Sequence, residues 1–127
     1  MDNPKKLFII DDETEIVEIL KPHFERRGFK VLTCPSGEEA LNLFQEESPD
    51  LVLLDYKLAG SMTGLDVIKK LKEANINTKV IFSTGALEDS VKEEAKNLGV
   101  EIFLLKPVLM ATLDEAIQGN LKSPNHG

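Results

Sequence analysis

Leu7-Phe8-Ile9-Ile10-Asp11-Asp12-Glu13, near the amino end of the sequence, joins four apolar residues directly to three acidic ones. A short, continuously apolar run of this kind suits a strand that is buried on both faces of a parallel sheet. The acidic residues begin where that strand would end. This segment therefore predicts a buried strand with a polar site at its carboxyl end.

Four more short runs, rich in leucine or β-branched residues, follow at 29–33, 51–54, 80–83 and 102–105. They are almost continuously apolar, so we expect all five strands to be buried on both faces. The longer segments between them have the apolar spacing of amphipathic helices. The predicted helices cover about 13–27, a segment that opens at Ser36, 65–74, 88–98 and 110–120.

Several residues mark the ends of these helices. Ser36, with Glu39 three residues later, has the spacing of a capping box. Gly28 and Gly99 each provide the left-handed residue that commonly ends a helix. Pro22 lies inside the first helix, where we expect a kink or a local irregularity.

Five strands that alternate with five helices predict a doubly wound α/β fold. For 127 residues, a flavodoxin-like parallel sheet with strand order 2-1-3-4-5 fits best. We expect a single domain over 1–127, with its core at about 5–121 and a frayed polar tail at 122–127.

Charge and cysteine content restrict the class of function. With 15 Lys and Arg against 22 Asp and Glu the net charge is −7, which argues against binding to nucleic acid or to a membrane surface. The amino-terminal residues suit neither a signal peptide nor a membrane span. Cys34 is the single cysteine and cannot form an internal disulfide, so we expect a cytoplasmic protein.

Polar residues follow four of the five predicted strands. Asp11 and Asp12 follow the first strand, Asp55 the third, Thr84 the fourth and Lys106 the fifth. In the order 2-1-3-4-5 these strand ends lie along one edge of the sheet, where sites form in such folds. Carboxylates suit Mg²⁺, while a lysine and a hydroxyl can bind phosphoryl oxygens. The set predicts a Mg²⁺-dependent phosphoryl acceptor.

Each of these residues also has an ordinary structural explanation. The pair Asp11-Asp12 could simply begin a helix, where negative charge is favourable. Asp55 could be a loop residue, and Thr84 and Lys106 could belong to exposed turns. Their joint occurrence at the ends of different strands favours a shared site.

The chain resembles the receiver domains of two-component response regulators, of the chemotaxis-regulator type, over about residues 5–121. The matching segments are LFIIDDE at 7–13, DLVLLD at 50–55, VIFSTG at 80–85 and FLLKP at 103–107. Each is weak alone, but together their order and spacing are highly specific. The resemblance implies a signalling phosphoprotein that catalyses its own phosphorylation and dephosphorylation, rather than a turnover enzyme.

The resemblance also assigns roles to residues. Asp55 would accept a phosphoryl group from a phosphohistidine on a sensor histidine kinase or a phosphotransfer protein, giving an aspartyl phosphate. Asp12 would bind Mg²⁺, or Mn²⁺, directly, and Asp11 would bind it through a water. Asp55 itself and the backbone carbonyl of Lys57 would complete the protein ligands.

The remaining implied roles concern activation. Lys106 would pair with the phosphoryl group, and its peptide bond to Pro107 would be cis. Thr84 would move toward the phosphoryl group while the ring of Phe103 changes rotamer. The face formed by the fourth helix, fifth strand and fifth helix would then bind a downstream protein, an effector domain of a longer chain or a second phosphorylated copy.

The sequence departs from the family after Asp55. Many relatives have Met-Pro-Gly there, whereas residues 58–64 read LAGSMTG, without the proline and with one residue more before Gly64. Lys57 places a bulky cation beside the predicted site, and we expect it to hinder the water that hydrolyses the aspartyl phosphate. Leu109 stands where relatives often have a polar helix cap, so we expect an irregular start to the last helix.

Three other functions share parts of this pattern. A phosphatase of the haloacid-dehalogenase type also uses an aspartate nucleophile with Mg²⁺, but it needs a second aspartate at the position of Lys57. A flavin-binding protein of the same fold needs a Ser/Thr-rich phosphate loop after the first strand, where this chain has aspartates. A receiver-like interaction module that has lost phosphorylation is disfavoured by the complete set of site residues.

Overall fold

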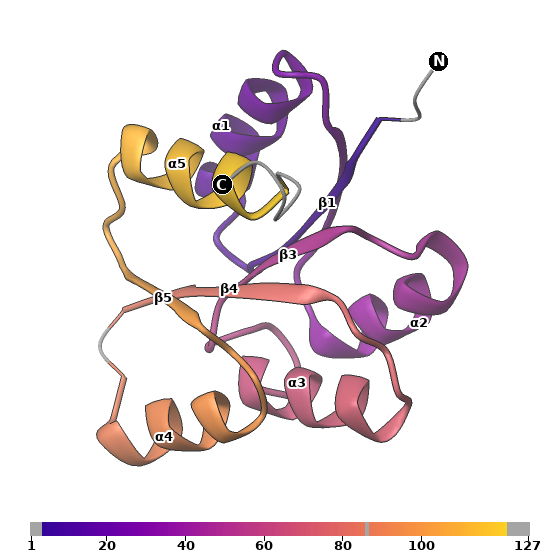
Figure 1. The fold of residues 1–127 in the computed structure, drawn as a ribbon, viewed down its shortest axis with the longest axis vertical. Helices are drawn as coiled ribbons and strands as arrows, with labels where there is room; N and C mark the ends of the chain where they lie inside the picture. The colour runs from indigo at the N-terminus through magenta and orange to yellow at the C-terminus, as the bar shows by residue number, and fades with distance from the viewer. Residues whose placement is uncertain (1–3, 86, 122–127) are drawn as a thin grey trace.

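The computed structural model describes residues 4–85 and 87–121, so the predicted tail at 122–127 lies outside the described residues. Five strands alternate with five helices, within two residues of their predicted positions (Figure 1). The strands are β1 (Lys6–Ile10), β2 (Lys30–Cys34), β3 (Leu51–Leu54), β4 (Lys79–Thr84) and β5 (Ile102–Leu105). The helices are α1 (Thr14–Glu25), α2 (Gly37–Glu47), α3 (Gly64–Glu73), α4 (Asp89–Asn97) and α5 (Met110–Leu121).

The strands form one sheet in the order β2-β1-β3-β4-β5, and every neighbouring pair is parallel. Parallel neighbours need long crossover connections, which the helices provide. Helices α1 and α5 cover one face of the sheet, and α2, α3 and α4 cover the other (Figure 1). The predicted flavodoxin-like topology is confirmed.

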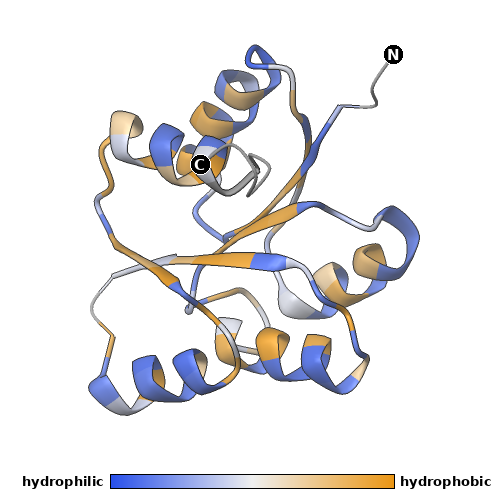
Figure 2. Ribbon diagram, in the orientation of Figure 1, coloured by the Kyte–Doolittle hydropathy of each residue, from blue (hydrophilic) through white to orange (hydrophobic). Residues whose placement is uncertain are grey.

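Alternate residues of the central strands point to opposite faces of the sheet, and apolar side chains fill both directions. In β1, Leu7 and Ile9 join the cluster beneath α1 and α5, whereas Phe8 and Ile10 join the cluster on the other face. All four are fully buried. Figure 2 shows the apolar strands in the middle of the molecule, between helices of mixed character. The continuous apolar runs in the sequence follow from this two-sided burial.

The two edge strands, β2 and β5, are less buried than predicted. β2 pairs only with β1, and β5 only with β4, and several of their side chains are only partly buried. Leu105, the last residue of β5, is 71% exposed. The expectation of burial on both faces was therefore wrong for these two strands, because the helices cover the edges of the sheet less completely than its centre.

The helix ends agree with their sequence signals. The Ser36 hydroxyl accepts a hydrogen bond from the Glu39 N–H at 3.2 Å and so caps α2, which is one half of the predicted capping box. A complete capping box, which the sequence analysis missed, is formed by Thr63 and Asp66 at the start of α3. Gly28 and Gly99 have φ values of 94° and 103°, in the left-handed region that favours glycine. Helix α1 continues through Pro22 without ending there.

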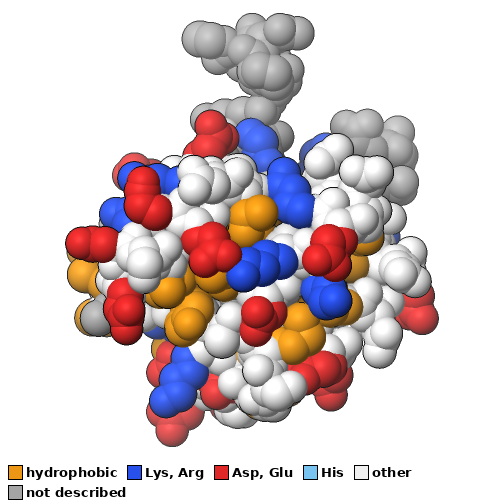
Figure 3. All heavy atoms as spheres, turned by 90° about the horizontal axis from the view of Figure 1, so that it is seen from below, with side chains coloured by type: hydrophobic (Ala, Val, Ile, Leu, Met, Phe, Trp, Pro, Cys, Tyr) orange, Lys and Arg blue, Asp and Glu red, His pale blue; other side chains and the backbone are white. Residues whose placement is uncertain are grey.

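In the part of the chain that the structure describes, no helix is long and apolar enough to cross a membrane. Figure 3 shows the molecule from the side on which α3 and α4 lie in Figure 1. Acidic and basic side chains are interspersed over that face, with apolar ones between them. The described side chains therefore form no continuous basic patch on this one face.

Candidate functional site

The backbone of the sheet fixes the residues that follow the strands. The Asp55 N–H donates to the Ile10 carbonyl at 3.0 Å, and the Lys106 N–H donates to the Thr84 carbonyl at 2.7 Å. These hydrogen bonds continue the strand ladders past the ends of β3 and β5. As a result, the three residues Asp55, Thr84 and Lys106 start from defined positions along one edge of the sheet.

The ammonium group of Lys106 lies at the centre of the site. Its Nζ donates to Asp11 Oδ2 at 2.6 Å, to Glu13 Oε1 at 2.6 Å and to Asp55 Oδ2 at 3.0 Å. Asp11 and Asp55 are buried, and the Lys106 side chain is only 17% exposed. The charge-assisted hydrogen bonds to Asp11 and Asp55 lie in this poorly solvated place and are stronger than those of surface ion pairs. The Glu13 side chain is 51% exposed, so water weakens its contact with Lys106 more.

Burial and hydrogen bonding act against each other on these groups. Burial raises the pKa of Asp11 above its usual range, although the hydrogen bond from Lys106 lowers it. Burial alone would lower the pKa of Lys106, but hydrogen bonds to the three carboxylates outweigh it and raise that pKa. Lys106 therefore keeps its positive charge at physiological pH.

Asp11, Asp12 and Asp55 form a group that can hold one divalent cation. One carboxylate oxygen from each lies within 4.8 Å of the others. Oxygens bound to a single Mg²⁺ at about 2.1 Å lie about 3 to 4 Å apart, so small side-chain rotations would bring these three into one coordination sphere. Asp12 is exposed while the other two are buried, so a cation could enter from the Asp12 side.

The segment between β3 and α3 borders the site and is tied to the start of α2. The Ala59 N–H donates to the Pro35 carbonyl at 3.0 Å. The Ser61 hydroxyl donates to Glu38 Oε2 at 3.0 Å. These contacts fix the loop that lacks the family's usual proline. Lys57, in the same segment, is exposed and lines the site.

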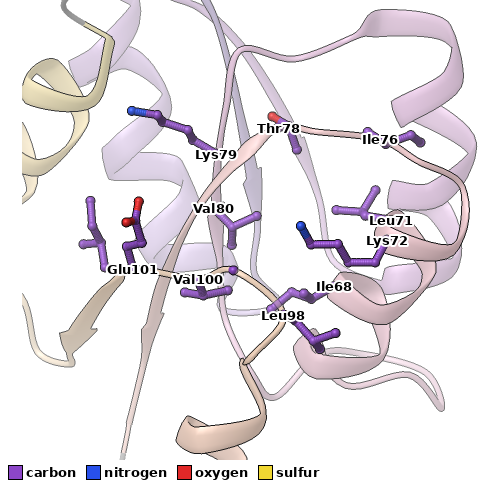
Figure 4. A pocket seen from close by; sticks show the side chains of 12 residues that line it. Ile68, Leu71, Lys72, Ile76, Thr78, Lys79, Val80, Leu98, Val100 and Glu101 are labelled. Carbon is purple, nitrogen blue, oxygen red and sulfur yellow. The ribbon is translucent and has the colours of Figure 1, made fainter. Parts of the chain in front are cut away.

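A hollow of about 920 Å³ opens beside the acidic group, with apolar walls from α1 and α5. Its polar lining includes Asp11, Asp55, Thr84 and Lys106. A second hollow, of about 120 Å³, lies at the opposite ends of β4 and β5, beside α3 (Figure 4). None of the site residues predicted from the sequence lines this second hollow.

Phe103 is not among the residues that line the larger hollow. The centre of its ring lies 6.2 Å from that of Phe82, whose ring lies 6.4 Å from that of Tyr56. Lys92 Nζ lies 5.4 Å from the centre of the Phe103 ring. Thr84 is therefore at the site, whereas Phe103 is connected to it through neighbouring rings. The switch roles of both residues stay predictions.

The predicted carboxylates and the predicted lysine thus meet in one place. The Lys106–Pro107 peptide bond is cis, as the family resemblance implies. The sequence reasoning missed the contact of Glu13 with Lys106. Its only signal was the position of Glu13 directly after the acidic pair.

Comparison with known proteins agrees with this geometry. The family described as response regulator receiver domain matches residues 7–118. Sporulation initiation phosphotransferase F of Bacillus subtilis is 32% identical over 114 residues, which cover 90% of this chain and 91% of that protein. The alkaline phosphatase synthesis transcriptional regulatory protein PhoP of the same organism is 35% identical over 103 residues, 81% of this chain. The chain spans only 42% of PhoP.

Solved structures show the same likeness. A CheY-like response regulator receiver domain protein from Methanospirillum hungatei superposes with a TM-score of 0.87 at 29% identity, covering 93% of this chain and 94% of that one. The chemotaxis protein CheY4 of Vibrio cholerae gives a TM-score of 0.84 at 26% identity, with 93% and 99% covered. The likeness therefore extends over nearly the whole of both structures.

Proposed function

Because the chain belongs to the family of response regulator receiver domains, we propose that it is a phosphoacceptor switch in which Asp55 carries the phosphoryl group. The observation that carries this proposal is the contact of Lys106 Nζ with both buried aspartates, Asp11 and Asp55. An ammonium group held there can neutralise phosphoryl oxygens as they approach Asp55. The family is a signalling domain, so the product is a modified protein rather than a released metabolite.

In the proposed reaction, a carboxylate oxygen of Asp55 attacks the phosphorus atom of a phosphohistidine on a sensor histidine kinase or phosphotransfer protein. The new P–O bond forms as the P–N bond breaks, and the electron pair of that bond returns to the imidazole nitrogen. Water later attacks the same phosphorus atom, which releases inorganic phosphate and restores the Asp55 carboxylate.

Asp11, Asp12 and Asp55, with the backbone carbonyl of Lys57, would hold Mg²⁺ or Mn²⁺ in this reaction. When bound, the cation offsets the negative charge of the phosphoryl oxygens. The convergence of three carboxylate oxygens within 4.8 Å supports this assignment. Lys106 would supply a second positive charge to the same oxygens.

We further propose that Thr84 and Phe103 transmit phosphorylation to the face formed by α4, β5 and α5. Thr84 ends β4 at the site, and Phe103 lies in the neighbouring strand opposite Phe82. Leu105, at the end of β5, and Leu109, just before α5, are 71% and 75% exposed. Exposed apolar side chains of this kind suit contact with a protein partner.

The partner on that face is a downstream protein, an effector domain of a longer chain or a second phosphorylated copy. The first two possibilities fit the lengths of the relatives, since this chain covers 91% of phosphotransferase F but only 42% of PhoP, which has room for a further domain. A cytoplasmic location, proposed from the single cysteine, fits any of these partners.

Treatment with acetyl phosphate and Mg²⁺ tests the proposed function. Intact-mass measurement should show the gain of one phosphate in the wild type and no gain in Asp55→Asn. A receiver of known reactivity serves as the positive control in parallel. If that control gains phosphate and this chain does not, the alternative of an interaction module without phosphorylation is favoured.

A further inference from the structure

Glu13 does not belong to the aspartate group, the three residues Asp11, Asp12 and Asp55 that can hold a divalent cation. It does contact the ammonium group of Lys106, which also contacts Asp11 and Asp55. Its Oε1 accepts a hydrogen bond from Lys106 Nζ at 2.6 Å, the same distance as that between Lys106 and Asp11. We infer that Glu13 is a positioning residue that holds the Lys106 ammonium group when the aspartates bind a divalent cation. At the next step, Glu13 competes with the phosphoryl group for the same ammonium group. This inference rests on the proposed phosphoacceptor function.

The start of α1 depends on the backbone of Glu13 and not on its carboxylate. The Glu13 carbonyl accepts hydrogen bonds from the N–H groups of Ile16 and Val17 at 3.0 and 3.1 Å. Its own N–H donates to Asp11 Oδ1 at 2.9 Å. The side chain makes no capping hydrogen bond. A substitution confined to the carboxylate therefore tests its contact with Lys106 while the helix start is kept.

Three carboxylates share one ammonium group, and two of them belong to the group suited to a cation. A divalent cation bound by Asp11 and Asp55 would lie close to the Lys106 ammonium group that these carboxylates also hold, and the two positive charges would repel each other. Glu13 is free of this conflict, because it is the partner of Lys106 that lies outside the aspartate group. Its carboxylate can keep the lysine while the aspartates turn to the cation. Without Glu13, Lys106 would stay on the aspartates and oppose cation binding.

The contact between Glu13 and Lys106 favours Mg²⁺ binding but should slow the phosphorylation of Asp55 that follows it. Phosphoryl oxygens on Asp55 need Lys106 as their cationic partner, so Glu13 must release it. A neutral amide at position 13 would hold the lysine less firmly, since charge-assisted hydrogen bonds are roughly twice as strong as neutral ones. Glu13→Gln should therefore weaken Mg²⁺ binding and, at saturating Mg²⁺, speed phosphorylation. A merely structural role for Glu13 would not move the two quantities in opposite directions.

The experiment compares Glu13→Gln with the wild type and with Glu15→Gln as a matched control. Glu15 is an exposed acidic residue in the first turn of α1, and the ion pairs described for Lys106 do not include it. Its substitution removes the same charge nearby. Mg²⁺ affinity is measured from amide NMR shifts, and the initial phosphorylation rate from intact mass with acetyl phosphate at saturating Mg²⁺.

For Glu13→Gln we expect the Kd for Mg²⁺ to rise roughly three- to tenfold and the phosphorylation rate to rise at least about twofold. Glu15→Gln should change each by less than about twofold. Equal Mg²⁺ affinities in the two variants overturn the inference, as does a phosphorylation rate that falls together with Mg²⁺ affinity. Both results leave the proposed function intact, since the wild type still gains phosphate. A wild type that binds Mg²⁺ without gaining phosphate overturns the proposed function and the inference together.

Discussion

Gly64 packs directly against the backbone of Asp55. A Cβ atom at position 64 would collide with the Asp55 carbonyl oxygen and would lie 3.1 Å from the Phe82 ring. The Gly64 N–H also donates to the Tyr56 carbonyl at 2.7 Å. The first residue of α3 and the segment that leaves β3 therefore form one unit, and this unit supports the proposed nucleophile.

Gly64→Ala should damage both stability and phosphorylation. The added methyl group must displace the Asp55 backbone, so we expect the free energy of unfolding to fall by about 1–3 kcal/mol. Gly119→Ala in α5 is the matched control, because an added Cβ there meets nothing within 4 Å. That control should gain up to about 1 kcal/mol from helix propensity. Urea unfolding measures both, and a Gly64→Ala protein as stable as the wild type would contradict the packing argument.

The effect of Asp11→Asn on stability should depend on pH. The pKa of Asp11 is raised in the folded state by burial, so its carboxyl group favours folding below its ordinary pKa, and this contribution is lost as the pH rises. Asn cannot ionise, so we expect the stability of Asp11→Asn relative to the wild type to increase as the pH rises from about 3 toward 7. Urea unfolding over a pH series measures this increase. The exposed Asp12→Asn controls for loss of one negative charge, and a difference in stability that does not vary with pH speaks against the prediction.

Lys57→Asn should shorten the life of the aspartyl phosphate. Lys57 is exposed at the wall of the site, where its side chain can hinder the attacking water. A barrier lowered by about 1 kcal/mol corresponds to hydrolysis that is roughly fivefold faster. Loss of the phosphate mass after removal of acetyl phosphate gives the rate. Lys96→Asn, in the last turn of α4, is the control, and equal hydrolysis rates in all three proteins count against a role for Lys57.

Cys34 should resist alkylation in the folded protein. Burial raises the pKa of its thiol to about 12, so little thiolate is present at pH 8. The thiol also donates to the Ser36 carbonyl at 3.4 Å. We expect iodoacetamide to react at least about a hundredfold more slowly with native protein than with protein unfolded in urea. Mass spectrometry follows the reaction, and similar rates in the two states are the result that would exclude a buried structural thiol.

Local sequence patterns were sufficient for the elements and for the proposed site carboxylates. Apolar runs such as 51–54 gave the strands, because a strand covered on both faces needs no polar residues. Asp55 and Lys106 were found because the residue after a parallel strand must lie at the edge of the sheet. The burial of the edge strands was predicted less accurately. The run that forms β5 is as apolar as those of the central strands, yet its last residue, Leu105, is exposed.

The contacts that complete the site depended on the folded chain. Lys106 and Glu13 are 93 positions apart, and the Ser61–Glu38 hydrogen bond joins residues 23 positions apart. The hydrophobic pattern predicts where each strand ends and therefore which residue follows it. It does not predict which carboxylates the long side chain of Lys106 will contact. That choice is made by packing, burial and charge between elements that meet only in three dimensions.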